Sequence, residues 1–67
     1  MEDVMYMVID DHMDYIVSIV PDLDDAMMLA RRWNNKDDPR YHHYVVMECS
    51  RLYGESWLAA WRGVLNA

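Results

Sequence analysis

The sequence pattern changes at Pro21. The residues before it are typical of β-strands, whereas apolar residues after it recur at the spacing of an α-helix. Before Pro21, β-branched and aromatic residues dominate two runs, Val4–Ile9 and Tyr15–Val20, which predict two strands. The polar stretch Asp10–Asp14 between the two runs predicts the turn of a hairpin. Pro21 is expected to end the second strand, because proline cannot donate a hydrogen bond to a sheet.

After Pro21 the pattern predicts a helix. Asp22 is the expected N-cap, because Asp25 follows three positions later and acidic groups favour the positive end of the helix dipole. Asn34-Asn35 is expected to end the helix, because asparagine tolerates the left-handed conformation found there. Between these ends, apolar residues recur at helical spacing, at Ala26, Leu29, Ala30 and Trp33.

The second half of the chain predicts one further strand and one further helix. Lys36–Arg40 is expected to be a loop, and Tyr41–Cys49 a third strand. An amphipathic helix is expected from Gly54 onward. Its apolar positions are Trp57, Trp61, Val64 and Leu65. The order β-β-α-β-α predicts an α+β fold, a single domain over residues 1–67 with a three-stranded, antiparallel-type sheet.

A second interpretation makes residues 4–20 and 41–52 helical instead. Apolar residues in the first segment also recur at helical spacing, at Met5, Ile9, Met13, Ile16 and Val20. Asp38-Pro39 would then start a helix through Tyr41–Leu52, with Gly54 just past its end. This alternative is an all-α bundle of four short helices. The number of β-branched residues favours the α+β fold.

The chain has 67 residues and one cysteine, Cys49, so a single hydrophobic core rather than disulfides must hold it together. A reducing, cytoplasmic setting is therefore expected. The longest apolar runs are far shorter than a membrane span, and the acidic Glu2 and Asp3 do not suit a signal peptide. We therefore expect neither a targeting segment nor a membrane anchor.

The charge of the chain is unevenly distributed. Residues 1–30 hold eight acids and no Lys or Arg, and the net charge of the whole chain is −6. This balance argues against direct contact with nucleic acid, which needs cations to replace the counterions of phosphates. It favours a protein partner with a basic surface, because opposite charges speed and orient association. The acids predicted to contact that partner are Asp10, Asp11, Asp14, Asp24 and Asp25, and the predicted apolar anchors are Tyr6, Tyr44 and Trp33. The alternative is that the acids only solvate a turn and cap a helix.

No catalytic or metal-binding pattern is present. His12, His42, His43 and Cys49 lack the spacing of a metal site, and the chain has no glycine-rich phosphate loop. Cys49 alternates onto an apolar strand face, which indicates a structural thiol rather than a nucleophile. We therefore expect no enzyme activity, no cofactor and no metal.

The predicted strands are apolar on both faces, whereas a sheet with one solvated face alternates more cleanly. Either the last helix covers the second face, or that face meets another chain. This pattern favours a self-associating structural or assembly protein, such as a homodimer, that uses the sheet face or the helix of Trp57 and Trp61. It is the alternative to a protein that binds a basic partner.

The stretch Tyr15–Trp33, YIVSIVPDLDDAMMLARRW, is preceded by a short strand and followed by YHHYVVMEC. This layout, over about residues 4–49, resembles small acidic proteins made by bacteriophages, among them the T7-type inhibitor of bacterial RNA polymerase and anti-CRISPR proteins. The resemblance implies a nucleic-acid mimic that occupies the basic groove of a host nucleic-acid-handling protein, in the host cytoplasm. It carries over no individual functional residue.

Overall fold

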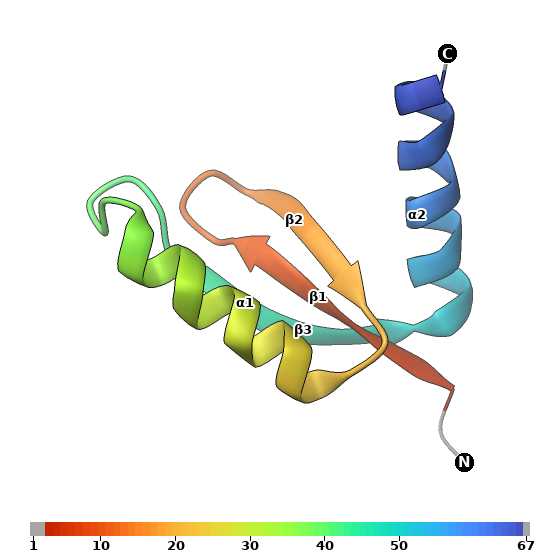
Figure 1. Cartoon of the computed structure of the whole chain (residues 1–67), viewed down its shortest axis with the longest axis horizontal. Coiled ribbons are helices and arrows are strands. Elements are labelled where there is room, and N and C mark those ends of the chain that lie inside the picture. Colours follow the sequence, from red (N-terminus) through yellow and green to blue (C-terminus); the bar gives the residue numbers. More distant parts are fainter. Residues whose placement is uncertain (1–2, 67) are drawn as a thin grey trace.

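The computed structural model describes residues 3–66 and shows five elements in the order β-β-α-β-α (Figure 1). The elements are β1 (Val4–Asp10), β2 (Tyr15–Val20), α1 (Leu23–Lys36), β3 (Tyr44–Ser50) and α2 (Arg51–Asn66). The predicted α+β fold is confirmed. The all-α alternative is wrong, because both segments that it made helical contain strands.

The three strands form one antiparallel sheet in the order β2-β1-β3, so β1 is central and β3 lies at an edge. The central Val8 pairs with Ser18 of β2 and with Val46 of β3. The register between β1 and β2 shifts after Val8, where Val17 is the extra residue of a bulge. Because of the bulge, Val17 packs toward the same core as Val20.

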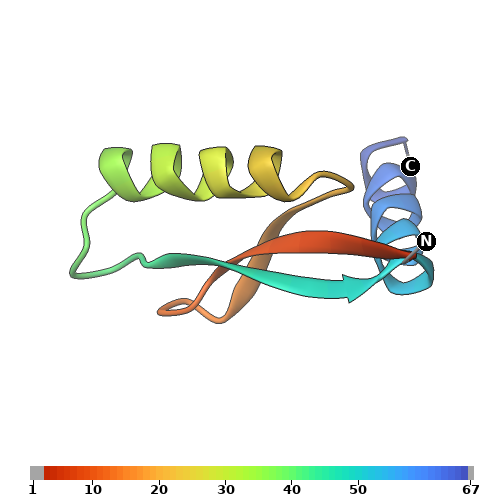
Figure 2. The same cartoon turned by 90° about the horizontal axis from the view of Figure 1, so that it is seen from below.

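Helix α1 covers one face of the sheet (Figure 2). Its buried side chains, Ala26 and Ala30, are small, so the helix approaches the strands closely and packs on Val8 and Tyr44. Since side chains alternate along a strand, Tyr6, Val8 and Asp10 face α1, whereas Met5, Met7 and Ile9 face away from it. The main core therefore lies between α1 and the strands.

Asp22 caps α1 as predicted, and its carboxylate accepts hydrogen bonds from the backbone N–H groups of Asp24 and Asp25 at 2.8 and 3.3 Å. The helix continues past the predicted end at Asn34-Asn35 to Lys36. Asn34 does not cap the helix. Its side-chain amide instead contacts the backbone of Tyr44, at the start of β3.

Two predicted boundaries in the second half are wrong. The third strand begins at Tyr44, because Tyr41 and His42 donate backbone hydrogen bonds to Asp38 in a turn. Helix α2 begins at Arg51, directly after β3, and its Gly54 packs against Met5 and Ile19. Val64 and Leu65 belong to α2, but their side chains lie outside the described residues.

Helix α2 lies across one end of the sheet and extends beyond it (Figures 1 and 2). This arrangement makes the molecule less compact than a typical domain of its length. The radius of gyration is 12.4 Å, whereas a compact domain of this length has about 10.9 Å.

Candidate functional site

The acids that the sequence analysis assigned to a partner do not form one surface. Asp11 and Asp14 are exposed in the turn between β1 and β2, whereas Asp24 and Asp25 are exposed in the first turn of α1. These positions lie at opposite ends of β2, a strand of six residues that is about 20 Å long. Asp11 is also paired with His43 at 3.2 Å. The exposed acids among the predicted contact residues thus form two separate pairs.

Asp10 is not available to a partner, and its assignment as a contact residue is wrong. It belongs to β1 rather than to the turn, and none of its surface is exposed. Its Oδ1 accepts hydrogen bonds from the N–H groups of His12 and Met13, each at 3.1 Å. Its Oδ2 lies 2.6 Å from Nδ1 of His42. Asp10 therefore anchors the turn and the segment before β3 from inside the fold.

The Asp10–His42 pair changes the pKa of both groups. Burial would raise the pKa of Asp10, but the hydrogen bonds from His42 and from backbone N–H groups outweigh it and hold the pKa below its ordinary value. The hydrogen bond to Asp10 raises the pKa of His42 above its ordinary value, with further help from the charges of Asp37 and Asp38. The pair is thus a charged bridge between positions 32 residues apart.

The stability of the fold is expected to depend on pH through this pair. The contribution of His42 is complete below the ordinary histidine pKa of 6.5 and is lost as the pH rises through its raised folded-state pKa. The contribution of Asp10 is complete above its ordinary pKa of 3.8 and is lost as the pH falls through its lowered folded-state pKa. Thermal unfolding should therefore show the full contribution of the pair between about pH 4 and pH 6.5. A His42→Gln variant should lose the decline on the alkaline side, and an unchanged decline would contradict the assignment.

The three predicted aromatic anchors have different environments. Tyr44 is only 3% exposed, and its hydroxyl donates a hydrogen bond to Asp37, so its prediction as a contact residue is wrong. Burial, followed by that hydrogen bond, raises the pKa of Tyr44. Tyr6 is half-buried against the core below α1. Trp33 is partly exposed beside Tyr44, with ring centroids 5.5 Å apart.

The face of the sheet opposite α1 is apolar, and no helix covers its middle among the described elements (Figure 2). We call it the open face and define it by Met7, Ile9, Ile16, Val45 and Met47. Four of these side chains are half-buried, and Met47 is 52% exposed. The sequence pattern predicts apolar residues on both sides of the strands, and the structure places them there.

Helix α2 adds two tryptophans at one end of the molecule. The rings of Trp57 and Trp61 stack at 6.1 Å between centroids, and Trp61 is 52% exposed. Cys49, on β3, is partly buried. Burial, with the adjacent charge of Glu48, raises the pKa of its thiol, which suits a structural rather than a reactive cysteine.

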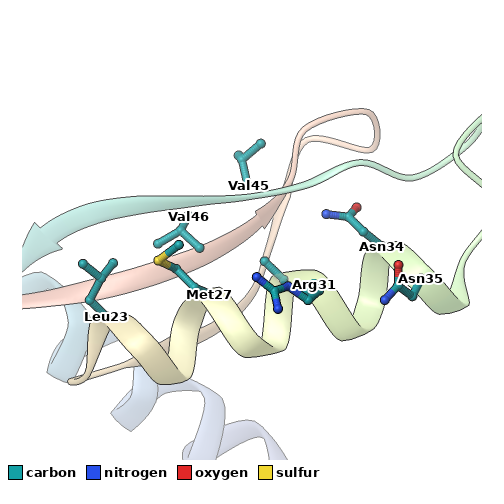
Figure 3. A pocket seen from close by; sticks show the side chains of 8 residues that line it. Leu23, Met27, Arg31, Asn34, Asn35, Val45 and Val46 are labelled. Carbon is teal, nitrogen blue, oxygen red and sulfur yellow. The ribbon is translucent and has the colours of Figure 1, made fainter.

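A groove runs between α1 and the edge strand β3 (Figure 3). It has a volume of about 630 Å³ and is lined chiefly by apolar side chains, with polar groups toward the end of α1. We call it the α1–β3 groove. Its lining residues include Leu23, Met27, Ala30, Arg31, Asn34 and Val46. No local sequence pattern predicts this groove, because it forms between segments that are distant in the sequence.

No group of three or more His, Cys, Asp or Glu side chains in the described part of the chain is arranged to hold a metal ion. No helix between residues 3 and 66 has the length and apolar character needed to cross a membrane.

Comparison of the chain with models of protein families, with curated proteins and with solved structures finds no match.

Proposed function

We propose that this chain is a non-enzymatic protein-binding domain that associates with a second copy of itself through the open face. The observation that carries the proposal is the uncovered apolar side of the sheet. A sheet with apolar side chains on both of its faces is stable in water only when both faces are covered. A second copy supplies the missing cover, because a two-fold axis brings identical patches together.

The size of the exposed surface supports a dimer. The accessible surface of the chain is 5105 Å², whereas a compact monomer of 8.0 kDa exposes about 4,450 Å². The excess of about 650 Å² is close to the roughly 800 Å² that each partner buries in a standard interface. The open face and helix α2, which extends beyond the sheet (Figure 2), both add to this excess, and association through the open face would remove part of it.

The small core supports the same conclusion. Among the described residues, the buried apolar side chains are Met5, Val8, Ile19, Ala26, Ala30 and Tyr44. Two of them are alanines, which contribute little apolar area. A single core in a chain of this length supplies only a few kcal/mol of net stability, so burial of further apolar area in a dimer stabilises the fold.

Binding to a protein with a basic surface, as the phage inhibitors do, stays a prediction. The exposed acids Asp11, Asp14, Asp24 and Asp25 lie in two pairs at opposite ends of β2, which supports two weak contacts better than one acidic ridge. We place the chain in the cytoplasm, because its single cysteine suits a reducing compartment.

The self-association is tested by replacing one exposed methionine. Met47→Glu puts a charge on the open face and is expected to turn the dimer into a monomer, because a buried unpaired carboxylate is unfavourable. Sedimentation equilibrium over a range of concentrations measures the mass. Met28→Glu is the matched control, because Met28 is 58% exposed but lies on α1, away from the open face.

Circular dichroism should show that both variants keep the fold of the original chain. A wild-type chain that stays monomeric up to about 1 mM would refute the proposal. So would a dimer that Met47→Glu leaves intact.

A further inference from the structure

We propose that the α1–β3 groove binds an extended segment of another protein, which adds to the sheet as a fourth strand beside β3. This site lies on the α1 side of β3, whereas the open face lies on the other side of the sheet, and Val45 borders both. Strand addition needs an edge with free backbone groups, a groove that receives alternate side chains, and a feature that selects the partner. The structure supplies all three.

The free backbone groups follow from the contact between Asn34 and Tyr44. The Asn34 side chain donates to the Tyr44 carbonyl at 2.9 Å and accepts from the Tyr44 N–H at 2.8 Å. The backbone groups of Tyr44 therefore point away from β1. Because this direction repeats every second residue, the N–H and C=O groups of Val46 and Glu48 also point outward. No other strand lies on that side in the described part of the chain.

Asn34 thus occupies the position that one peptide unit of a fourth strand would take. It makes the same pair of hydrogen bonds and closes the groove at the start of β3. The edge remains free at Val46 and Glu48, directly beside the apolar lining. An incoming segment would pair with these two residues and end before Tyr44.

The groove can receive two side chains of such a segment. Met27 and Arg31 are four positions apart on α1, which corresponds to about 6.0 Å along a helix. Two residues of a strand span about 6.6 Å, so side chains at positions i and i+2 of the segment would lie beside these two residues. An aliphatic side chain fits between Leu23, Met27 and Val46.

Charge selects the side chain of the segment that lies beside Arg31. Arg31 lies along the α1 side of the groove (Figure 3), and it takes part in none of the ion pairs found among the described residues. Glu48 carries a negative charge on the strand. An acidic residue is therefore favoured beside Arg31 and disfavoured near Glu48. The expected partner segment is extended, with an acidic residue two positions from a large aliphatic one.

The probe is the end-blocked peptide Thr-Asp-Thr-Ile-Thr-Val-Thr, together with the same residues in reverse order, because strands add in either direction. Each is titrated into ¹⁵N-labelled protein. We expect one of the two peptides to bind, with the largest changes in amide chemical shift at Val46 and Glu48. Arg31→Gln should weaken that binding at least about threefold, the scale of a partly exposed ion pair. Arg32→Gln is the matched control and should not weaken it.

N-methylated peptides test the strand geometry without changing the protein. Only every second N–H of the peptide faces β3, so methylation at the isoleucine and at the preceding threonine should have opposite results. One should abolish binding and the other should leave it intact. Equal effects of the two methyl groups would overturn the proposal, as would no binding of either peptide at about 1 mM. Nuclear Overhauser contacts between the β3 amide groups of two copies, seen without peptide, would show that a second copy occupies the edge and would also overturn it.

Discussion

Replacement of Asp10 by alanine is expected to lower the unfolding temperature by more than about 10 °C. The carboxylate is fully buried and holds the backbone N–H groups of His12 and Met13 together with the ring of His42. Alanine would leave these donors without an acceptor inside the fold, and a buried donor without a partner is strongly unfavourable. The measurement is thermal unfolding followed by circular dichroism at pH 6.

Asp11→Ala is the matched control for this variant. Asp11 is the next residue along the chain and also faces a histidine, but its carboxylate and the imidazole of His43 are both exposed to water. An exposed pair contributes about 0 to 1 kcal/mol, so the control should unfold within a few degrees of the wild type. Similar small shifts in both variants would show that Asp10 does not anchor the hairpin to the rest of the fold.

Replacement of Gly54 by valine is expected to destabilise the fold by about 1 to 3 kcal/mol and to loosen α2 from the sheet. A Cβ atom at this position would lie 2.6 Å from the Met5 sulfur and 3.1 Å from Cγ2 of Ile19. The sulfur ends a flexible side chain and can move, but the Cβ of Met5, at 3.2 Å, is less free. The two methyl groups of valine would increase the crowding. Chemical denaturation followed by tryptophan fluorescence measures the effect, because Trp57 and Trp61 lie on α2.

Gly63→Val is the control for this variant within the same helix. A Cβ atom at Gly63 would meet nothing within 4 Å. Valine has a better helix propensity than glycine, so this substitution should leave the stability unchanged or raise it by a few tenths of a kcal/mol. An equal gain at both positions would mean that α2 does not pack on the sheet through Gly54.

The order of elements could be predicted because each one has a local signal. The N-cap at Asp22 and the apolar spacing of α1 depend on neighbouring residues, and the structure confirms them. The bulge at Val17 has no such signal. It arises when β2 pairs with β1, and it sets which residues of β2 face α1.

The role of Asp10 could not be predicted for a similar reason. A run of aspartates between two strands is typical of an exposed turn, and Asp11 and Asp14 are indeed exposed there. Asp10 differs only because His42 and the N–H of His43, more than 30 positions away, close over it. The left-handed backbone of Asp14, with φ of 59°, then completes the turn in place of a glycine.

The two candidate surfaces also differ in whether the sequence predicts them. The open face was predictable, because alternation along a strand is visible in the sequence. The α1–β3 groove was not, because it requires knowledge that β3 lies at an edge and that Asn34 reaches it. Asparagine near the end of a helix is typical of a cap, and only the fold shows that its amide faces a strand.

The Asn34 amide also bears on how the protein avoids forming fibrils. An exposed edge strand can recruit copy after copy into an endless sheet, and natural proteins interrupt such edges. Here one side chain shields the first residue of β3 and leaves a stretch of bare backbone only a few residues long. A free edge of that length can pair with a short peptide segment, but it is too short to support the repeated addition of strands from further copies. Loss of the Asn34 amide would lengthen the unpaired edge of β3 and so favour insoluble aggregates.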